Sequence, residues 1–140
     1  MELSDAVDFA RSTGQSVVVT LKADGRPQLS NVLHHVDDDG VIRISITDDR
    51  AKTKNLRRDP RVSLYLTSDD FWKYVVIEGT AELSAVAQAP DDAVADALVD
   101  YYRAIRGEHP DWDEYRRAQV DQRRVMLRIH AERAYGMGVT

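Results

Sequence analysis

Hydrophobic and polar positions alternate along most of the chain between Ser16 and Leu83, a pattern typical of half-buried strands. A short helical period, with Leu3, Val7 and Ala10 on one side, precedes this region. The extended patterns are "SVVVTL", "QLSNVLHHV", "VIRISIT", "RVSLYLT" and "KYVVIEGTAEL". The turn signals "ADGRP" and "DDDG" separate the first three strands, so these strands are predicted to form a meander.

The period changes at Pro90, where apolar and aromatic residues begin to recur at helical spacing. One helix is predicted to end at Gly107, and "PDWDEY" begins another, with Asp111 and Glu114 at the spacing of a capping box. The segment "VMLRI", residues 125–129, predicts a sixth strand. Several short strands with few helices favour a mainly β fold of one domain, residues 1–140, that closes into a small barrel.

The composition limits the cellular locations and binding partners expected of this domain. The 140 residues contain no cysteine, which excludes disulfides and thiolate metal sites and favours a cytoplasmic location. No apolar run approaches the roughly 20 residues of a membrane span, and the amino terminus lacks the pattern of a signal peptide. The net charge of −5 argues against a general nucleic-acid binder.

One segment departs from this acidic balance. "DDRAKTKNLRRDPR", residues 48–61, holds six of the nineteen basic residues. Asp48 or Asp49 is predicted to cap a helix that ends before Asp59 and Pro60. Free backbone N–H groups in its first turn favour an anion, so the segment predicts a phosphate site. A solvated charged face is the alternative.

Polar side chains on the neighbouring strands also bear on whether this region is a ligand site or a solvated surface. Ser45 and Thr47 alternate with the isoleucines of "VIRISIT", and Gln28, Ser30 and Asn31 add short hydrogen-bonding groups. These residues form either one wall of a ligand site or the ordinary polar side of a half-exposed sheet.

Three segments, "GRPQLSNVLHH", "DRAKTKNLRRDPRVSLYL" and "WKYVVIEGTAEL", occur in an order that resembles the split-barrel flavin-binding superfamily, which includes pyridoxamine phosphate oxidase. The likeness runs from about Gly14 to Gly136 and is strongest to the actinobacterial subgroup of reductases that use the deazaflavin coenzyme F420. It implies a six-stranded antiparallel split β-barrel with short flanking helices. It also implies a homodimer with two equivalent cofactor sites at the interface.

The cofactor-binding residues that the resemblance implies are Gln28, Ser30, Asn31, Ser45, Ile46, Thr47, Arg50, Lys52, Thr53, Asn55, Trp72, Lys73 and Tyr74. Arg50 and Lys52 would hold the phosphate, and the two strands would line the ring system. The segment around Trp72 would reach the site from the partner subunit. From charge alone, the other basic residues of the segment are expected to meet the oligoglutamate tail of F420; these are Lys54, Arg57, Arg58 and Arg61.

The expected chemistry is hydride transfer from reduced F420 to a small, planar, electron-poor organic acceptor. The sequence contains none of the motifs GxSxG, HExxH or a P-loop, and we assign neither a catalytic residue nor a metal site. His34 and His35 point to opposite faces of a strand, and one of them is a candidate proton donor.

The aromatic residues receive three different interpretations. Trp72 is expected to lie over the cofactor or substrate, and the segment 135–137 to close the far side of the pocket. The others fall at helical spacing and are expected in the core or an interface; these are Tyr101, Tyr102, Trp112 and Tyr115.

Three other functions stay open at this point. An FMN-dependent enzyme of the pyridoxamine phosphate oxidase type would use the same phosphate site. A carrier or sensor would bind the cofactor without turnover. A nucleic-acid-binding barrel ranks last, because the basic segment lacks the interleaved aromatic residues on which bases stack.

Overall fold

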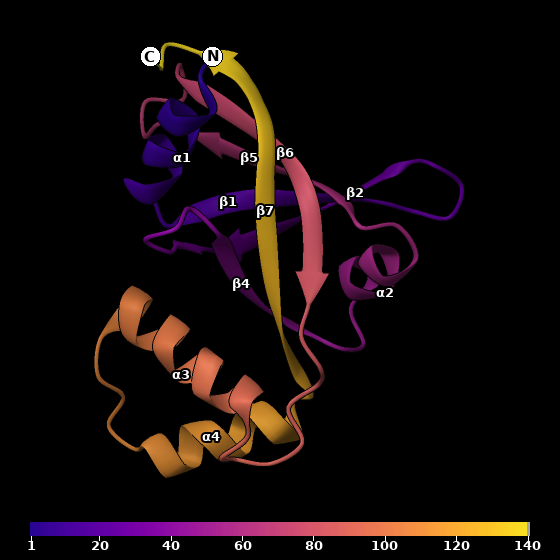
Figure 1. The fold of residues 1–140 in the computed structure, drawn as a ribbon, viewed down its shortest axis with the longest axis vertical. Helices are drawn as coiled ribbons and strands as arrows, with labels where there is room; N and C mark the ends of the chain where they lie inside the picture. The colour runs from indigo at the N-terminus through magenta and orange to yellow at the C-terminus, as the bar shows by residue number, and fades with distance from the viewer. Residues whose placement is uncertain (140) are drawn as a thin grey trace.

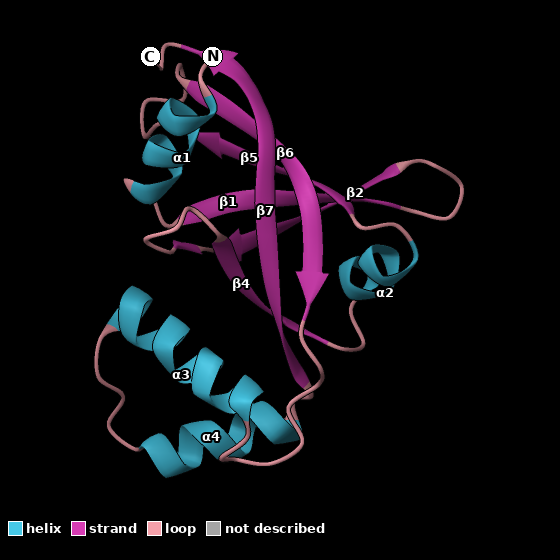
Figure 2. Ribbon diagram, viewed as in Figure 1, coloured by secondary structure: helices cyan, strands magenta, loops and turns pink. Residues whose placement is uncertain are grey.

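The computed structural model describes residues 1–139, in which a mainly antiparallel sheet is flanked by short helices (Figures 1 and 2). The helices are α1 (Leu3–Arg11), α2 (Ala51–Arg58), α3 (Ala93–Arg106) and α4 (Trp112–Asp121). The strands are β1 (Gln15–Leu21), β2 (Pro27–Leu33), β3 (His35–Val36), β4 (Ile42–Thr47), β5 (Arg61–Thr67), β6 (Tyr74–Leu83) and β7 (Arg124–Met137). They form one sheet in the order β2-β1-β5-β6-β7-β4-β3.

The sheet curls into a half-barrel, which confirms the predicted split-barrel fold with seven strands in the described chain rather than six. The additional strand arises because "QLSNVLHHV" is interrupted at His34. Residues before this point pair with β1, whereas His35 and Val36 pair with β4 at the other edge of the sheet. One continuous segment therefore joins the two edges, and β2 and β4 come close to each other.

The alternating apolar positions fill the inside of the curl. Ile42, Ile44 and Leu64 are fully buried, and Val62 and Leu66 are nearly so. Helix α1 packs against this core through its two buried alanines, Ala6 and Ala10. The period-two pattern therefore predicted the inward face of these strands correctly.

Strand β7 is much longer than the predicted residues 125–129. Residues 124–129 pair with β4, and the last three of them also pair with β6, whereas the half from His130 onward pairs with β6 alone. That second half contains no buried residue, and its two large hydrophobic side chains, Tyr135 and Met137, are exposed, so the buried alternation ends before the strand does. The predicted bulge at Gly79 is confirmed, because the register of β6 against β7 shifts between Glu78 and Gly79.

His34 is buried where the chain changes partners. Its Nε2 lies 2.9 Å from the carbonyl oxygen of Ala10 and its Nδ1 lies 2.8 Å from the hydroxyl of Ser16. The carbonyl can only accept, so Nε2 carries the proton of the neutral ring and Nδ1 accepts from Ser16. Burial lowers the pKa of His34, opposed by the bond to Ala10 and reinforced by His35.

We therefore expect the free energy of unfolding to fall as the pH falls below about 6.5, the ordinary pKa of histidine. The unfolded chain then binds a proton that the folded chain resists, which costs up to about 1.4 kcal/mol per pH unit. Urea denaturation between pH 5.5 and 7.5 measures this slope. The slope should become shallower in His34→Gln and persist in His130→Gln, which replaces an exposed histidine. Equal slopes in wild type and His34→Gln would contradict the assignment.

Candidate functional site

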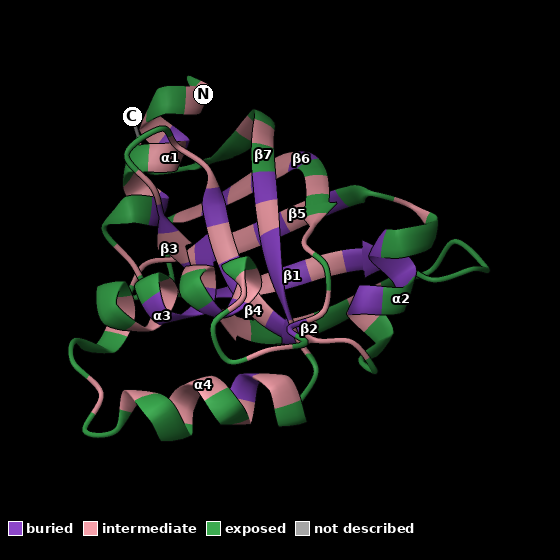
Figure 3. Cartoon of the chain, turned by 60° about the horizontal axis from the view of Figure 1, so that its bottom comes forward, coloured by how far each residue is buried: buried purple, intermediate pink, exposed green. Residues whose placement is uncertain are grey.

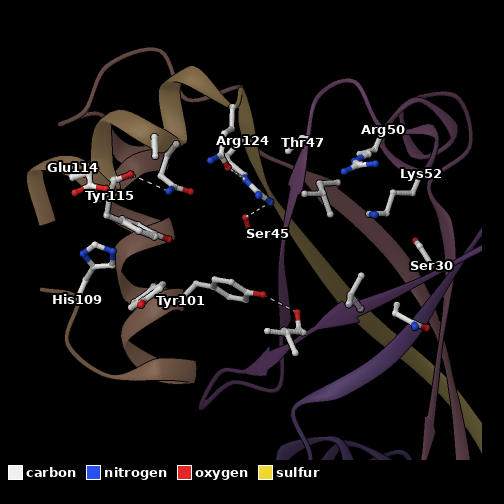
Figure 4. A pocket seen from close by; sticks show the side chains of 18 residues that line it. Ser30, Ser45, Thr47, Arg50, Lys52, Tyr101, His109, Glu114, Tyr115 and Arg124 are labelled. Atoms are coloured by element: carbon white, nitrogen blue, oxygen red, sulfur yellow. Dashed lines mark hydrogen bonds between the residues drawn. The ribbon is translucent and has the colours of Figure 1, made fainter. Parts of the chain in front are cut away.

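A cleft of about 700 Å³ is lined by residues of β2, β4, the start of α2, α3 and α4 (Figure 4). Figure 3 shows α3 and α4 next to the end of the molecule where β2 and β4 lie. The cleft marks the place where the curled sheet stays open. The predicted cofactor-binding residues that line it are Ser30, Asn31, Ser45, Ile46, Thr47, Arg50 and Lys52. These residues come from three separate segments of the chain, and the fold brings them to one surface.

Helix α2 is fixed at one end of the cleft by a chain of polar contacts. Asn55 Nδ2 donates to the Thr20 hydroxyl at 3.1 Å, and that hydroxyl donates to Gln28 Oε1 at 3.1 Å. Thr53 Oγ1 donates to the carbonyl oxygen of Thr47 at 2.6 Å. Gln28, Thr53 and Asn55 do not line the cleft. In this chain they hold α2 against the sheet, so their predicted contact with the cofactor stays a prediction.

The predicted cap of α2 is wrong. Arg50 occupies the N-cap position and forms no side-chain cap. Asp49 instead accepts from the hydroxyl of Thr47, and Asp48 is bound by arginines elsewhere. Within residues 1–139, neither the N–H of Ala51 nor that of Lys52 donates a hydrogen bond. The first turn therefore presents free donors beside the cleft.

Three cations meet at this end of the cleft: Arg50, Lys52 and Arg124. No acidic side chain of residues 1–139 forms an ion pair with any of them. Burial lowers the pKa of Lys52, and the positive charges of Arg50 and Arg124 lower it further. Like charges held together in a partly buried site destabilise each other unless an anion is bound, so the arrangement favours an anionic ligand.

Arg124 is a site residue that the sequence did not indicate. It begins β7 and lies opposite Thr47 in the register of β4. Its guanidinium contacts the Ser45 hydroxyl at 3.4 Å and Gln122 Oε1 at 2.9 Å (Figure 4). The local pattern around it is that of an ordinary strand start, and only the strand pairing brings it to the cleft.

Most of the other basic residues in segment 48–61 have partners. Arg57 pairs with Asp48 at 2.5 Å, Arg61 pairs with Asp59 at 2.7 Å, and Arg58 donates to the Leu21 carbonyl at 2.6 Å. The bonds from Arg61 hold the pKa of Asp59 down at about 2, so this pair stays charged near neutral pH. The excess positive charge seen in the sequence is therefore partly neutralised within the fold.

Ser30 adds a second observation that is compatible with ligand binding in this cleft. Its Oγ is buried without a hydrogen-bond partner among residues 1–139. A buried hydroxyl without a partner costs on the order of 1–3 kcal/mol. In Figure 4, Ser30 lies below Lys52 on the same side of the cleft. A ligand that accepts from Lys52 is thus placed to satisfy Ser30 as well.

Helices α3 and α4 supply the opposite wall of the cleft. The Tyr101 hydroxyl donates to the Leu33 carbonyl at 2.7 Å, and the Tyr115 hydroxyl donates to the Leu98 carbonyl at 2.9 Å. Burial raises the pKa of Tyr101, and it raises the pKa of Tyr115 to about 12. Tyr101, Tyr102 and Tyr115, which were expected in the core or an interface, are partly buried and also line the cleft.

The remaining predicted site residues lie away from this cleft. Trp72 is 76% exposed in the turn between β5 and β6. Lys73 adjoins it, and Tyr74 stacks on Tyr65 with ring centres 6.0 Å apart. The segment 135–137 pairs with the start of β6, so it does not close this cleft.

Neither candidate proton donor lines the cleft of its own chain. His34 is enclosed beneath α1, and His35 lies on the far side of the sheet edge near Asp37. The hypothesis that one of them delivers a proton within the same subunit is therefore wrong. Within residues 1–139, no group of three or more histidine or acidic side chains is arranged to hold a metal ion, and no helix is long and apolar enough to span a membrane.

A curled antiparallel sheet with a phosphate-compatible cleft at its open side defines the class of flavin-binding split barrels. A model of the pyridoxamine 5'-phosphate oxidase family matches residues 4–138, and the chain belongs to that family.

Three solved structures of similar fold represent different kinds of protein. A conserved hypothetical protein from Mycobacterium tuberculosis is 29% identical, with a TM-score of 0.73 over 97% of this chain and 84% of that one. An F420 reductase is 23% identical, with a TM-score of 0.62 over 87% and 89% of the two chains. A heme-binding protein from Mycobacterium smegmatis is 22% identical, with a TM-score of 0.69 over 97% and 53%. The last two likenesses bear on the fold alone.

Proposed function

We propose that this chain binds coenzyme F420 in the cleft and passes hydride from its reduced form to a small organic acceptor. The observation that carries the proposal is the group of three cations, Arg50, Lys52 and Arg124, beside the first turn of α2. Among residues 1–139 these cations have no ion-pair partner, and the N–H groups of Ala51 and Lys52 donate no hydrogen bond. A phosphate there meets charged side chains and backbone donors together. The partnerless Ser30 hydroxyl fits the same ligand.

The residues of this chain would bind, orient and shield the cofactor. Arg50 and Lys52 would hold its phosphate, while Ser45 and Thr47 would offer hydroxyls along one wall. Bound F420 in its reduced form supplies the hydride, and the protein supplies position and electrostatics. The absence of any catalytic motif is consistent with this division of roles.

An F420 reductase shares this fold, which is compatible with F420 but does not select it over FMN. One feature of α2 favours F420 in the proposal. Lys54 is an exposed residue of α2 that forms no ion pair within residues 1–139, so it is free to attract a polyanionic tail. The tail contacts first expected of Arg57 and Arg61 are weakened, because both arginines pair with aspartates.

Calorimetric titration of the cofactor-free protein with F420 and, separately, with FMN tests the proposal. Saturable binding of F420 with much weaker binding of FMN supports it. Preference for FMN would place the protein with the FMN-dependent enzymes of the family, and binding of neither would overturn the cofactor site. A single-turnover experiment with reduced F420 and menadione then separates an enzyme from a carrier, because a carrier leaves the cofactor reduced.

We also propose that two copies of the chain form a homodimer through the outer face of β2, β1 and β5. Directly paired residues share a face, so Leu29 lies beside Val19, and Val17 beside Tyr65. Leu29 is 58% exposed, and an apolar hollow of about 480 Å³ lies on this face near Val17 and Tyr65. A partner bound there would cover the apolar side chains, and its Trp72 segment is expected to complete the site.

Light scattering checks the dimer. The chain mass is 15.8 kDa, so a dimer has twice this value. Leu29→Asp should give the monomer mass, because a buried unpaired carboxylate opposes association. Ala104→Asp, an acidic substitution at an exposed position of α3, serves as the control and should leave the mass unchanged. A wild-type monomer at micromolar concentration would contradict the proposal.

A further inference from the structure

The wall of the cleft that faces the cations carries several aromatic side chains. Four rings pack together where α3 meets α4: Tyr102, His109, Trp112 and Tyr115. Their centroids are 4.9–5.7 Å apart. Three of them, Tyr102, His109 and Tyr115, also line the cleft, and Trp112 does not. We call these three residues the aromatic wall. Figure 4 shows His109 and Tyr115 across the cleft from Arg50 and Lys52.

The aromatic wall is held rigidly from outside the cleft. Arg103 lies over the ring of Trp112 at 4.8 Å, and Glu108 accepts from both Arg103 and the Trp112 indole, at 2.8 and 2.9 Å. The loop between α3 and α4 is fixed in this way against the helix ends. A preorganised aromatic surface binds a flat ring without the entropic cost of ordering its own side chains.

The polar groups of the wall are few and directional. The Tyr115 hydroxyl is already bound to Leu98, so this residue offers its ring rather than a donor. His109 Nδ1 accepts from the N–H of Asp111 at 2.9 Å, which places the proton of the neutral ring on Nε2 and leaves that N–H free to donate. Glu114 is exposed at the same wall, and no cation of residues 1–139 pairs with it.

We infer that the aromatic wall is a second binding subsite that takes a neutral, planar aromatic carbonyl compound. The ring of such a ligand would stack on the wall, and its carbonyl oxygen would accept from His109 Nε2–H. The carboxylate of Glu114 would disfavour an anionic ring. The cationic end would at the same time hold the phosphate of the cofactor. This subsite rests on the proposed function in one respect: its occupant is the molecule that receives the hydride.

Binding of menadione, a neutral naphthoquinone, to the full chain tests the subsite. Calorimetry is run on the cofactor-free protein and again after saturation with F420. Tyr102→Leu removes one ring and should weaken menadione binding about fivefold, the effect of one aromatic contact. His109→Phe keeps a ring but removes the donor, and should weaken binding about threefold to tenfold. Phe9→Leu, which removes a ring of α1 outside the cleft and outside this cluster, is the control and should leave the affinity within about twofold.

The charge preference is tested with 2-hydroxy-1,4-naphthoquinone, which is an anion at neutral pH, in phosphate buffer that occupies the cationic end. Glu114→Gln should raise its affinity relative to menadione by about threefold or more, since a like charge is removed. Asp113→Asn, which replaces an exposed carboxylate of α4 that does not line the cleft, should leave this ratio unchanged. An unchanged ratio in Glu114→Gln would overturn the role of Glu114.

Two outcomes would overturn the subsite itself. Menadione affinity could be the same in Tyr102→Leu and His109→Phe as in wild type. Alternatively, these two variants could lose F420 binding in parallel, which would assign the wall to the cofactor. Failure of F420 to bind at all would overturn the proposed cofactor and leave the measurement of menadione on the cofactor-free protein as an independent test of the wall.

Discussion

Replacing Lys52 by alanine will weaken F420 binding by about 1.5–3 kcal/mol, the range of a hydrogen bond to a charged group. The ammonium group is partly buried next to Arg50 and Arg124, and burial together with these neighbours lowers its pKa. A bound phosphate would offset the repulsion between Lys52 and the two arginines. In the complex, the substitution therefore removes the attraction between Lys52 and the phosphate, and in the free protein it removes the repulsion between Lys52 and the arginines. The variant should therefore fold as stably as the wild type.

Calorimetry of F420 binding and thermal unfolding of the free protein together check this result. Lys54→Ala is the matched control, because it removes an exposed lysine two residues further along α2. It should change the affinity by less than about 1 kcal/mol, as expected of an exposed and screened charge. Equal losses in the two variants would mean that affinity comes from the general charge of α2 and not from the cluster in the cleft.

A large loss of stability is expected for Gly79→Ala. A Cβ added at Gly79 would lie 2.2 Å from the carbonyl oxygen of His130 and 3.2 Å from the Cα of Ala131. Both atoms belong to the backbone of β7, which pairs with β6 over this stretch. The two strands must separate to make room, and we expect a loss of about 3 kcal/mol in the free energy of unfolding.

Urea denaturation measures this loss, with Gly14→Ala as the control. No atom lies within 4 Å of a Cβ added at Gly14. This second variant should be neutral or more stable by about 0.4–1 kcal/mol, because alanine reduces the freedom of the unfolded chain. If Gly79→Ala unfolds at the same urea concentration as the wild type, the close approach of β6 and β7 is not a constraint.

The elements that the sequence predicted correctly are strands with one solvent-exposed face and one buried face. Ile42, Ile44 and Ile46 alternate with polar residues because β4 buries only one side, and the period revealed both the strand and its orientation. The outer half of β7 gave no such signal, since it pairs with a single neighbour and buries little. The break at His34 was also hidden, because a strand that changes sheet edges keeps its extended pattern.

The same distinction applies to the candidate site: residues with a local sequence signal were predicted, and residues brought to the cleft by strand pairing or helix packing were not. Arg50 and Lys52 were predicted because a local helix start and local charges suffice to propose a phosphate site. Arg124 and the aromatic wall could not be predicted, since they reach the cleft only through the register of β4 with β7 and the packing of α3 against α4. The misplaced cap at Asp48 has a similar cause: its partners include Arg123, which is distant in sequence.

The curled sheet has two edge strands, and neither is well suited to pair with a strand of another chain. A free strand edge is a template on which another chain can add, and long flat edges seed aggregates. Here β3 provides only two residues at one edge. At the other edge, β2 contacts α2, and the Tyr101 hydroxyl donates a hydrogen bond to the carbonyl oxygen of Leu33. The incompletely closed barrel thus ends in one very short edge strand and one partly covered edge strand, which disfavours the addition of further strands to it.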